Sequence, residues 1–150
     1  MARILRIDHI GLAVQDEQAA RFWEALGLAR AGSETVPAEG VTVGFFPVGP
    51  SRIELLEPSA GEGPVQKFLA NRGEGIHHIC FEVDDIRGLL AQLIAAGVEL
   101  TSPEPRPGAE GSLVAFIHPR AAHGVLIELR QSAGGAASHS LEEGMAHGAG

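Results

Sequence analysis

Two histidines stand at equivalent places in an internal repeat of this sequence. The segment at residues 7–16 (IDHIGLAVQD) is echoed at residues 76–85 (IHHICFEVDD), which puts His9 and His78 in register, 69 residues apart. A single histidine in an apolar strand is more often a structural residue than a ligand. Its recurrence in two copies is more informative, because imidazole nitrogen is a frequent ligand of divalent metals.

Two glutamates extend the repeat. Glu54 lies in the apolar segment RIELL, 45 residues after His9, and Glu128 lies in the segment VLIEL, 50 residues after His78. A carboxylate between aliphatic residues is costly to bury without a cation or a donor, although in a strand it can also alternate outward to water. Two similar modules packed about a pseudo-two-fold axis would bring both His–Glu pairs to one centre. The repeat therefore predicts a metal site with four ligands.

The types of these side chains narrow the choice of metal. Two imidazoles and two carboxylates suit a borderline divalent ion such as Co, Ni, Mn, Fe or Zn, with positions left open to water or substrate. Calcium takes oxygen ligands instead, and structural zinc more often uses thiolates that close its coordination shell. We therefore expect a catalytic metal site.

The composition excludes other classes of function. The 150 residues carry a net charge of -8 at pH 7 with only 11 Lys and Arg, which argues against nucleic acid or an anionic membrane as a partner. Cys80 is the only cysteine, so no intramolecular disulfide can form, and its apolar neighbours predict a buried, inert thiol. Since no stretch approaches the roughly 18 apolar residues of a membrane span, we expect a soluble, cytoplasmic protein.

Each half of the chain predicts one helix among four strands, and a further short helix is expected between the halves. Helices are expected at residues 17–26, after a cap at Asp16, at residues 65–72, and at residues 86–96, after Asp84 or Asp85. Strands are expected at residues 4–14, 30–36, 41–48 and 51–57 in the first half and at residues 76–83, 98–101, 113–117 and 124–130 in the second. Each half thus forms a βαβββ module.

The two modules, at about residues 4–58 and 75–131, are expected to form one domain at residues 1–131. Residues 132–150 are rich in Gly, Ala, Ser and His and predict a disordered tail. Between the last strands, residues 102–112 contain three prolines and two glycines, which suits a loop over a site. Arg106 and the segments 108–112 and 118–123 are candidate substrate contacts, although an ordinary surface loop explains them equally well.

Several motifs together resemble one family. They are IDHIG at residues 7–11, IELLEP at 53–58, GEGIHHI at 73–79, EPRPG at 104–108, HP at 118–119 and GVLIEL at 124–129. With the tandem βαβββ pattern, they make residues 7–131 similar to the vicinal oxygen chelate, or glyoxalase-like, superfamily, and within it most similar to the methylmalonyl-CoA epimerases. The resemblance implies an α+β fold in which two modules form a curved mixed sheet around a metal site.

The resemblance also implies the chemistry. By position, the ligands of a divalent metal (Co, Ni, Mn or Zn) would be His9, Glu54, His78 and Glu128, with His77 pointing to the opposite face of its strand. The implied enzyme is an isomerase that interconverts (R)- and (S)-methylmalonyl-CoA, removing and returning the α-proton through a metal-stabilised enolate. The implied partners are an acyl-CoA substrate and a second copy of the chain in a homodimer.

Epimerisation needs proton carriers on both faces of the substrate. Some relatives use the carboxylate matching Glu128 together with a glutamate at the place of Val43, and valine cannot carry a proton. Because the pseudo-two-fold relates Glu54 to Glu128, we expect these two glutamates to form the acid/base pair.

Three other functions use the same fold. Glyoxalase I would use the same four ligands on a glutathione hemithioacetal, although the motifs outside the ligands favour the epimerase. An extradiol dioxygenase would need only His9, His78 and Glu128 and would leave Glu54 without a role. A metal-free binding protein of the drug-sequestering kind would have no need of all four ligand types.

Overall fold

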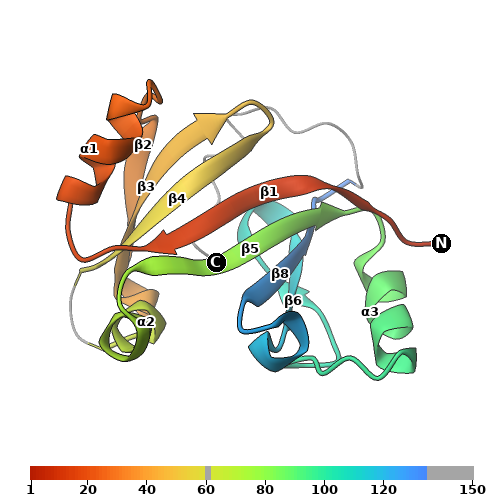
Figure 1. Cartoon of the computed structure of the whole chain (residues 1–150). Coiled ribbons are helices and arrows are strands. Elements are labelled where there is room, and N and C mark those ends of the chain that lie inside the picture. The colour runs from red at the N-terminus through yellow and green to blue at the C-terminus, as the bar shows by residue number, and fades with distance from the viewer. Residues whose placement is uncertain (60–61, 135–150) are drawn as a thin grey trace.

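The order of strands in the sheet places the two predicted modules side by side. The computed structural model describes residues 1–59 and 62–134, which form an eight-stranded sheet in the order β2-β3-β4-β1-β5-β8-β7-β6 (Figure 1). The first half contributes β1 (Ile4–Ala13), β2 (Gly32–Val36), β3 (Val41–Val48) and β4 (Ser51–Pro58), and the second β5 (Gly75–Val83), β6 (Arg106–Pro107), β7 (Leu113–Ile117) and β8 (Leu126–Gln131). The α-helices are α1 (Gln18–Ala25), α2 (Pro64–Arg72) and α3 (Ile86–Ala95), and the short 3-10 helices are η1 (Pro37–Glu39), η2 (Ala109–Gly111) and η3 (Pro119–Ala122).

Strands β1 and β5 join the two modules at the centre of the sheet. They run antiparallel, and Ile10 pairs with Ile79, its equivalent 69 residues later in the repeat. On their other sides, β1 pairs in parallel with β4, and β5 pairs in parallel with β8. The pseudo-two-fold axis therefore passes close to Ile10 and Ile79. The α+β fold with a curved mixed sheet, expected from the sequence, is confirmed (Figure 1).

Most predicted elements agree with the structure to within two residues, but the strand expected at residues 98–101 is wrong. Only Leu100 pairs there, through an isolated bridge to Ile117 of β7. The strand at the edge of the sheet is β6 instead, which pairs with β7. Pro103 and Pro105 separate the two segments, and proline offers no N–H with which to continue a ladder. The chain therefore leaves the sheet before these prolines and regains its edge only at β6.

The alternation of side chains along β4 gives the first module two different faces. Ile53 and Leu55 point toward α1 and join an apolar cluster with residues of that helix. Glu54 and Leu56 point the other way. On their side α2 closes the sheet with an apolar cluster made of Ala13, Val41, Val43, Phe45, Leu56, Val65 and Leu69.

The second module has an apolar face and a charged face. Leu129 of β8 points toward α3 and packs in an apolar cluster with that helix. On the opposite face, Glu82 pairs with Arg130 across β5 and β8, where the first module pairs Ala13 with Leu56. Glu82 and Arg130 form a buried ion pair, 2.8 Å between Oε1 and Nη1. We call the side of the sheet that lies opposite α1 and α3 its inner face. At equivalent positions this inner face is polar in the second module and apolar in the first.

The end of the predicted domain can be compared with the structure as far as Gly134. Ser132 is buried, and its N–H and Oγ both donate to Glu82 Oε2, at 2.9 and 2.7 Å. It therefore packs with the domain, although the sequence assigned it to the tail. Residues 135–150 lie outside the described residues, so the predicted tail is not tested there.

Two expectations from the composition can also be compared with the structure. Cys80 is a free thiol with no exposed surface, as predicted. Within residues 1–59 and 62–134, none of the helices has both the length and the apolar character needed to cross a bilayer.

The contacts of Ser132 generate a prediction about truncation. A chain that ends at Gln131 should be less stable than one that ends at Gly134 by about 1–3 kcal/mol, because the buried carboxylate of Glu82 loses two donors. Urea unfolding of the two truncated proteins, followed by circular dichroism, measures the difference. Equal midpoints and slopes would show that Ser132 adds nothing to the packed domain.

Candidate metal centre

The pairing of β1 with β5 is irregular beside each of the two histidines. The register skips Asp8, just before His9, and it skips His77, just before His78. Asp8 and His77 are themselves equivalent in the repeat. An extra residue in one strand bends it and redirects its side chains, which lets neighbouring side chains meet on one side of the strand. The two irregularities therefore bring each histidine into contact with the polar residue that precedes it.

Three of the four predicted ligands meet at the centre of the molecule. His9 Nε2 lies 3.0 Å from His78 Nε2, and Glu128 Oε1 lies 3.7 Å from each of these nitrogens. All three side chains are buried, and their ligand atoms lie within 4.8 Å of one another. The histidines come from β1 and β5 and the glutamate from β8. The structure thus unites residues that are up to 119 positions apart in the sequence.

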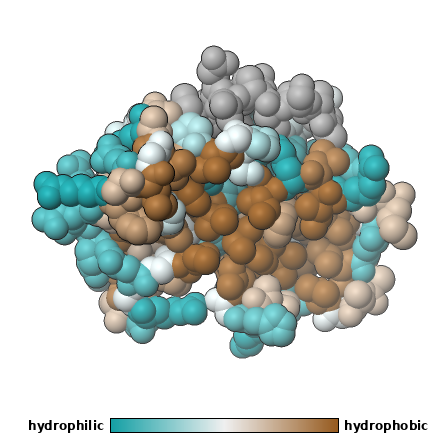
Figure 2. Space-filling view, turned by 45° about the horizontal axis from the view of Figure 1, so that its top comes forward, coloured by the Kyte–Doolittle hydropathy of each residue, from teal (hydrophilic) through white to brown (hydrophobic). Residues whose placement is uncertain are grey.

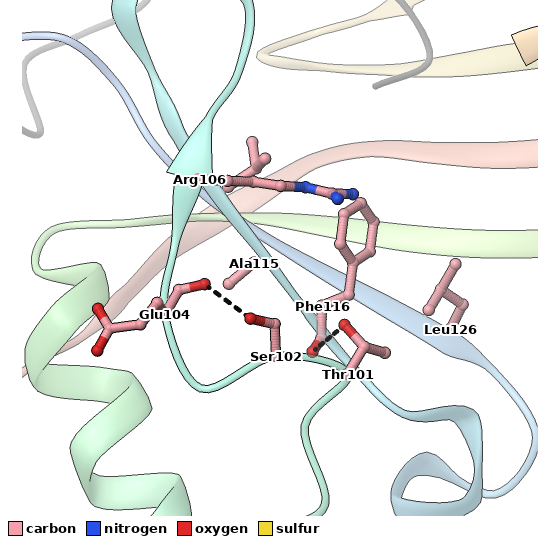
Figure 3. Close-up of a pocket in the computed structure, with 8 residues that line it drawn as sticks. Thr101, Ser102, Glu104, Arg106, Ala115, Phe116 and Leu126 are labelled. Carbon is pink, nitrogen blue, oxygen red and sulfur yellow. Dashed lines mark hydrogen bonds between the residues drawn. The ribbon is translucent and has the colours of Figure 1, made fainter.

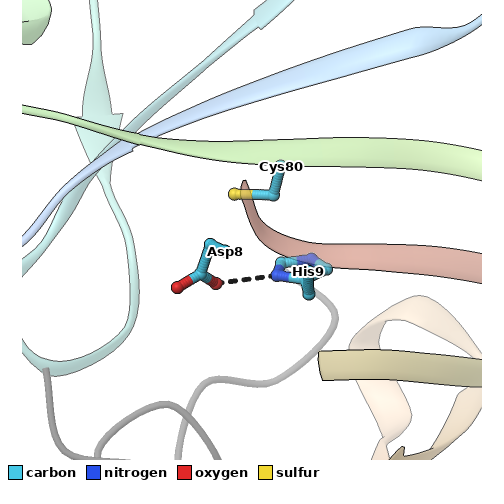
Figure 4. Close-up of side chains that lie close together, drawn as sticks. All are labelled: Asp8, His9 and Cys80. Atoms are coloured by element: carbon cyan, nitrogen blue, oxygen red, sulfur yellow. Dashed lines mark hydrogen bonds and ion pairs between the residues drawn. The ribbon is translucent and has the colours of Figure 1, made fainter. Parts of the chain in front are cut away.

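Asp8 fixes the orientation of His9. Its Oδ2 lies 2.8 Å from His9 Nδ1 (Figure 4) and 3.3 Å from Arg52 Nη1, and its Oδ1 accepts a hydrogen bond from Arg6 at 2.9 Å. Burial would raise the pKa of Asp8, but the hydrogen bond from His9 and the charge of Arg52 outweigh it and hold this pKa well below its usual range. The ionised carboxylate accepts the Nδ1–H of His9, so the lone pair on Nε2 points into the cluster.

His77 holds His78 in a corresponding way. The two Nδ1 atoms lie 2.9 Å apart, and the rings meet edge to face. The prediction that His77 points to the opposite face is therefore wrong, because the irregular pairing of β5 turns its side chain toward His78. Burial lowers the pKa of both histidines, that of His78 far more, which keeps His78 neutral and able to act as a ligand.

Gly11 provides the space for the ring of His78. It pairs with His78 across β1 and β5, and a Cβ atom at Gly11 would lie 2.3 Å from His78 Cε1.

On the other side of the pseudo-two-fold, Cys80 pairs with His9, and its sulfur lies close to Asp8 and His9 (Figure 4). Burial, and then the charge of Glu128, raise the pKa of the Cys80 thiol far above its usual value. Cys80 therefore remains a protonated thiol beside the cluster.

Glu54, the fourth predicted ligand, lies at the other edge of His9. Its Oε2 accepts a hydrogen bond from Arg52 Nε at 2.6 Å and lies 3.5 Å from His9 Nδ1. The carboxylates of Glu54 and Glu128 thus face opposite edges of one imidazole. Burial is the main cause that raises the pKa of both, and the charge of Glu54 raises that of Glu128 further.

The donor set fits a cation. Among the described residues, Glu54 Oε1 and Glu128 Oε1 are buried without a hydrogen-bond donor, which is costly unless a positive charge lies close by. Two imidazole nitrogens with lone pairs complete a mixed N and O set of the kind that borderline divalent metals prefer. A cluster that could hold a metal ion is therefore present, built on three of the four predicted residues.

Val43 has no place in this cluster. It is fully buried in the apolar cluster under α2 and pairs with Leu56 across β3 and β4.

Asp8, His77, Arg52 and Gly11 are the site residues that the sequence reasoning missed. The signal for Asp8 and His77 was present, since a polar residue precedes the histidine in both copies of the repeat.

Comparison with known proteins gives one family and several relatives. Residues 8–116 match the Glyoxalase/Bleomycin resistance protein/Dioxygenase superfamily. The chain is similar to the ethylmalonyl-CoA/methylmalonyl-CoA epimerase of Cereibacter sphaeroides, with 41% identity over 130 residues that cover 84% of this chain and 97% of the relative. It is also similar to the uncharacterized protein YqjC of Bacillus subtilis, with 44% identity over 131 residues that cover 86% of this chain and 94% of the relative.

Solved structures agree with these relatives. A methylmalonyl-CoA epimerase in complex with methylmalonyl-CoA and NH4+ matches with a TM-score of 0.74 at 36% identity, over 90% of this chain and 99% of that one. A variant of the Streptomyces coelicolor methylmalonyl-CoA epimerase in complex with 2-nitronate-propionyl-CoA matches with the same score, identity and coverage. The fold and the arrangement of the strands are thus shared along nearly the full length of these chains.

The hydrogen bond between Asp8 and His9 generates a prediction. Replacing Asp8 by Asn should lower the affinity for Co²⁺ by about 10–100-fold, because a neutral amide holds the Nδ1–H of His9 less firmly and can turn its NH₂ toward the ring. Isothermal titration calorimetry on the apoprotein measures the affinity. Glu34→Gln, which removes an exposed carboxylate of β2, is the control and should bind as the unchanged protein does. Equal affinities in both variants would remove Asp8 from the metal centre.

Proposed function

Because the chain belongs to the glyoxalase/bleomycin resistance protein/dioxygenase superfamily, we propose that it is an isomerase that interconverts the (R) and (S) forms of methylmalonyl-CoA. The resemblance to methylmalonyl-CoA epimerases, first recognised from motifs, is confirmed by relatives of that name at about 40% identity. The observation that carries the proposal is the meeting of His9, His78 and Glu128 in a buried cluster with carboxylate oxygens that lack donors.

In this proposal His9, His78 and Glu128 hold a divalent metal. Glu54, whose Oε1 lacks a donor, would be the fourth ligand once its side chain turns from the Nδ1 edge of His9 toward this cluster. Co, Ni, Mn and Zn all suit these donors. When bound, such an ion supplies positive charge next to the thioester oxygen, on which negative charge develops as the α-proton leaves. Asp8 and His77 keep the two imidazoles in the orientation and protonation state that the site requires.

The proton carriers are the second part of the proposal. Glu128 lines a cavity of about 310 Å³ together with His77, His78, Phe116 and Leu126, so its carboxylate can reach a substrate placed there. Glu54 is proposed as the second carrier because the repeat relates it to Glu128. It is fully buried and does not line this cavity, so its side chain would have to turn past His9 to reach the substrate. Burial raises the pKa of both carboxyl groups in the absence of a metal, and a bound divalent cation would favour their ionised form, which can remove a proton.

One alternative has an observation in its favour. His9, His78 and Glu128 alone form a two-histidine, one-carboxylate set, the ligand type of non-heme iron oxygenases. The relatives named as epimerases match this chain over most of its length, whereas nothing in the cluster gives a role to Glu54 in such an oxygenase. The epimerase therefore has the stronger support, and consumption of dioxygen with a catechol would favour the alternative.

The proposal includes a homodimer in the cytoplasm. Large apolar side chains are exposed on β1, at Ile4, Leu5 and Ile7, and at Ile76 of β5. Figure 2 shows apolar surface gathered across the middle of one face of the molecule, as a face that is covered in a dimer would be. The buried, unpaired thiol of Cys80 is consistent with a reducing compartment.

The test of the mechanism replaces each glutamate by glutamine. Glu54→Gln should keep a metal ligand, because an amide oxygen can coordinate, but it removes one proton carrier. Net conversion between the epimers should fall by about two orders of magnitude or more. One epimer should still exchange its α-proton with D₂O at the remaining carboxylate, and Glu128→Gln should favour exchange of the other epimer. Mass spectrometry and chiral analysis of each pure epimer measure both quantities.

The matched control is Glu57→Gln, on the same strand but three residues further along, which should convert and exchange at the native rate. If Glu54→Gln also epimerises at the native rate with its metal fully bound, Glu54 acts only as a ligand. The second proton carrier is then another group that lines the cavity, or a water molecule. If the unchanged protein neither exchanges nor converts methylmalonyl-CoA, the proposed function is wrong.

A further inference from the structure

A second cavity adjoins the metal centre. It has a volume of about 430 Å³ and is lined by Thr101, Ser102, Glu104, Arg106, Val114, Ala115, Phe116 and Leu126 (Figure 3). Three of these residues, Arg106, Phe116 and Leu126, also line the smaller cavity that holds His78 and Glu128. The two cavities therefore meet at Arg106 and Phe116.

The second cavity continues the metal-centre cavity along the inner face of the second module. On the side of the first module, α2 and the apolar cluster beneath it close the inner face of the sheet. On the side of the second module, the inner face carries the two cavities instead. A substrate too large for the 310 Å³ at the metal centre can therefore extend past Arg106 into the second cavity.

Arg106 is a cation without a partner at this junction. Its guanidinium lies over the ring of Phe116, 5.4 Å from the ring centre, as Figure 3 shows. Within residues 1–59 and 62–134, no carboxylate forms an ion pair with it. Glu104 lines the same cavity, but its carboxylate points away from the guanidinium in Figure 3. Arg106 is exposed on β6, so its N–H groups can turn to a ligand, and the stack on Phe116 keeps the positive charge at the junction.

The position of Phe116 places this charge close to the reacting groups. Phe116 pairs with Glu128 across β7 and β8, so the ring under Arg106 is a direct neighbour of the proposed proton carrier. An anionic substrate would be repelled by Glu128 and Glu54, and a guanidinium at the junction offsets that repulsion. Arginine is also the side chain best suited to bind a carboxylate through two parallel hydrogen bonds.

The rest of the second cavity suits an uncharged, flexible chain. Thr101 Oγ1 donates to the carbonyl of Phe116, and Ser102 Oγ donates to the carbonyl of Glu104, both at 3.4 Å (Figure 3). Both hydroxyl oxygens keep lone pairs that can accept N–H groups. Val114, Phe116 and Leu126 supply apolar surface on the other side. This mixture of hydroxyl and apolar groups fits the part of an acyl-CoA that follows the thioester, an arm made of amides and methylene groups.

We propose that Arg106 binds the free carboxylate of a malonyl-type thioester and so selects this class of substrate, while the second cavity holds the amide-containing arm that follows the thioester. The inference rests on the proposed function. The anion at Arg106 is the acyl carboxylate rather than a phosphate of the carrier, because Arg106 also lines the metal-centre cavity, where the acyl group reacts. The phosphates of coenzyme A are separated from the acyl group by the whole length of the arm.

The inference is tested by comparing the affinities of two ligands in the unchanged protein and in variants of Arg106. Propionyl-CoA lacks only the carboxylate of methylmalonyl-CoA, so the two ligands isolate the contribution of that group. Arg106→Gln should weaken the binding of methylmalonyl-CoA by about 10–100-fold, the scale of a lost hydrogen-bonded ion pair, and should leave the binding of propionyl-CoA unchanged. Arg106→Lys should restore part of the loss. Isothermal titration calorimetry on the metal-loaded protein measures all the affinities.

The control is Arg87→Gln, which removes an exposed arginine of α3 and should change neither affinity. An equal loss for both ligands in Arg106→Gln would assign Arg106 to the phosphates and overturn the inference. Unchanged binding of methylmalonyl-CoA would overturn it as well. Because the titration measures binding without turnover, a protein that binds methylmalonyl-CoA through Arg106 but does not epimerise it would refute the proposed function alone.

Discussion

The antiparallel pairing of β1 with β5 brings the two histidines of the metal centre together, and the parallel pairing of β8 with β5 adds Glu128. Ile10 opposite Ile79 sets the pseudo-two-fold, and two of the residues that the register skips, Asp8 and His77, turn toward the histidines that follow them. A slip of the register by one residue would turn His78 to the other face of the sheet. The meeting of the two imidazole nitrogens at 3.0 Å, and with it the proposed chemistry, thus depends on backbone hydrogen bonds in one strand pair.

The metal centre lowers the stability of the fold, and the two modules contribute to that stability in different ways. Buried carboxylate oxygens without donors lower the free energy of unfolding. This free energy is typically only about 5–15 kcal/mol, so the loss matters. The first module offsets this cost with the apolar cluster that α2 closes over Val43 and Leu56. The second module leaves its inner face open and polar, with Glu82 paired to Arg130. A cation that binds the native state should also stabilise the fold.

The sequence predicted what repeats and missed what depends on register. The recurrence of His9 at His78 and of Glu54 at Glu128 predicted the strands, the mixed sheet and a shared centre, because equivalent residues of a duplicated module must face one axis. The contact of His77 with His78 was not predicted, since an irregular pairing has no signature in one strand alone. Glu54 is held at the Nδ1 edge of His9 by Arg52, which stands two residues earlier on β4 and faces the same side of that strand. The repeat did not predict this contact, because Arg52 has no charged equivalent at Leu126.

X-ray diffraction from crystals grown with Co²⁺, recorded on both sides of the cobalt absorption edge, tests the central claim most directly. We expect one anomalous peak at coordination distance from His9 Nε2, His78 Nε2 and the carboxylate of Glu128, the three atoms that the two modules bring together. The peak should be absent from His78→Ala crystals. No peak at this centre, or a peak that survives the loss of His78, would contradict the account of the site given by the β1–β5 pairing.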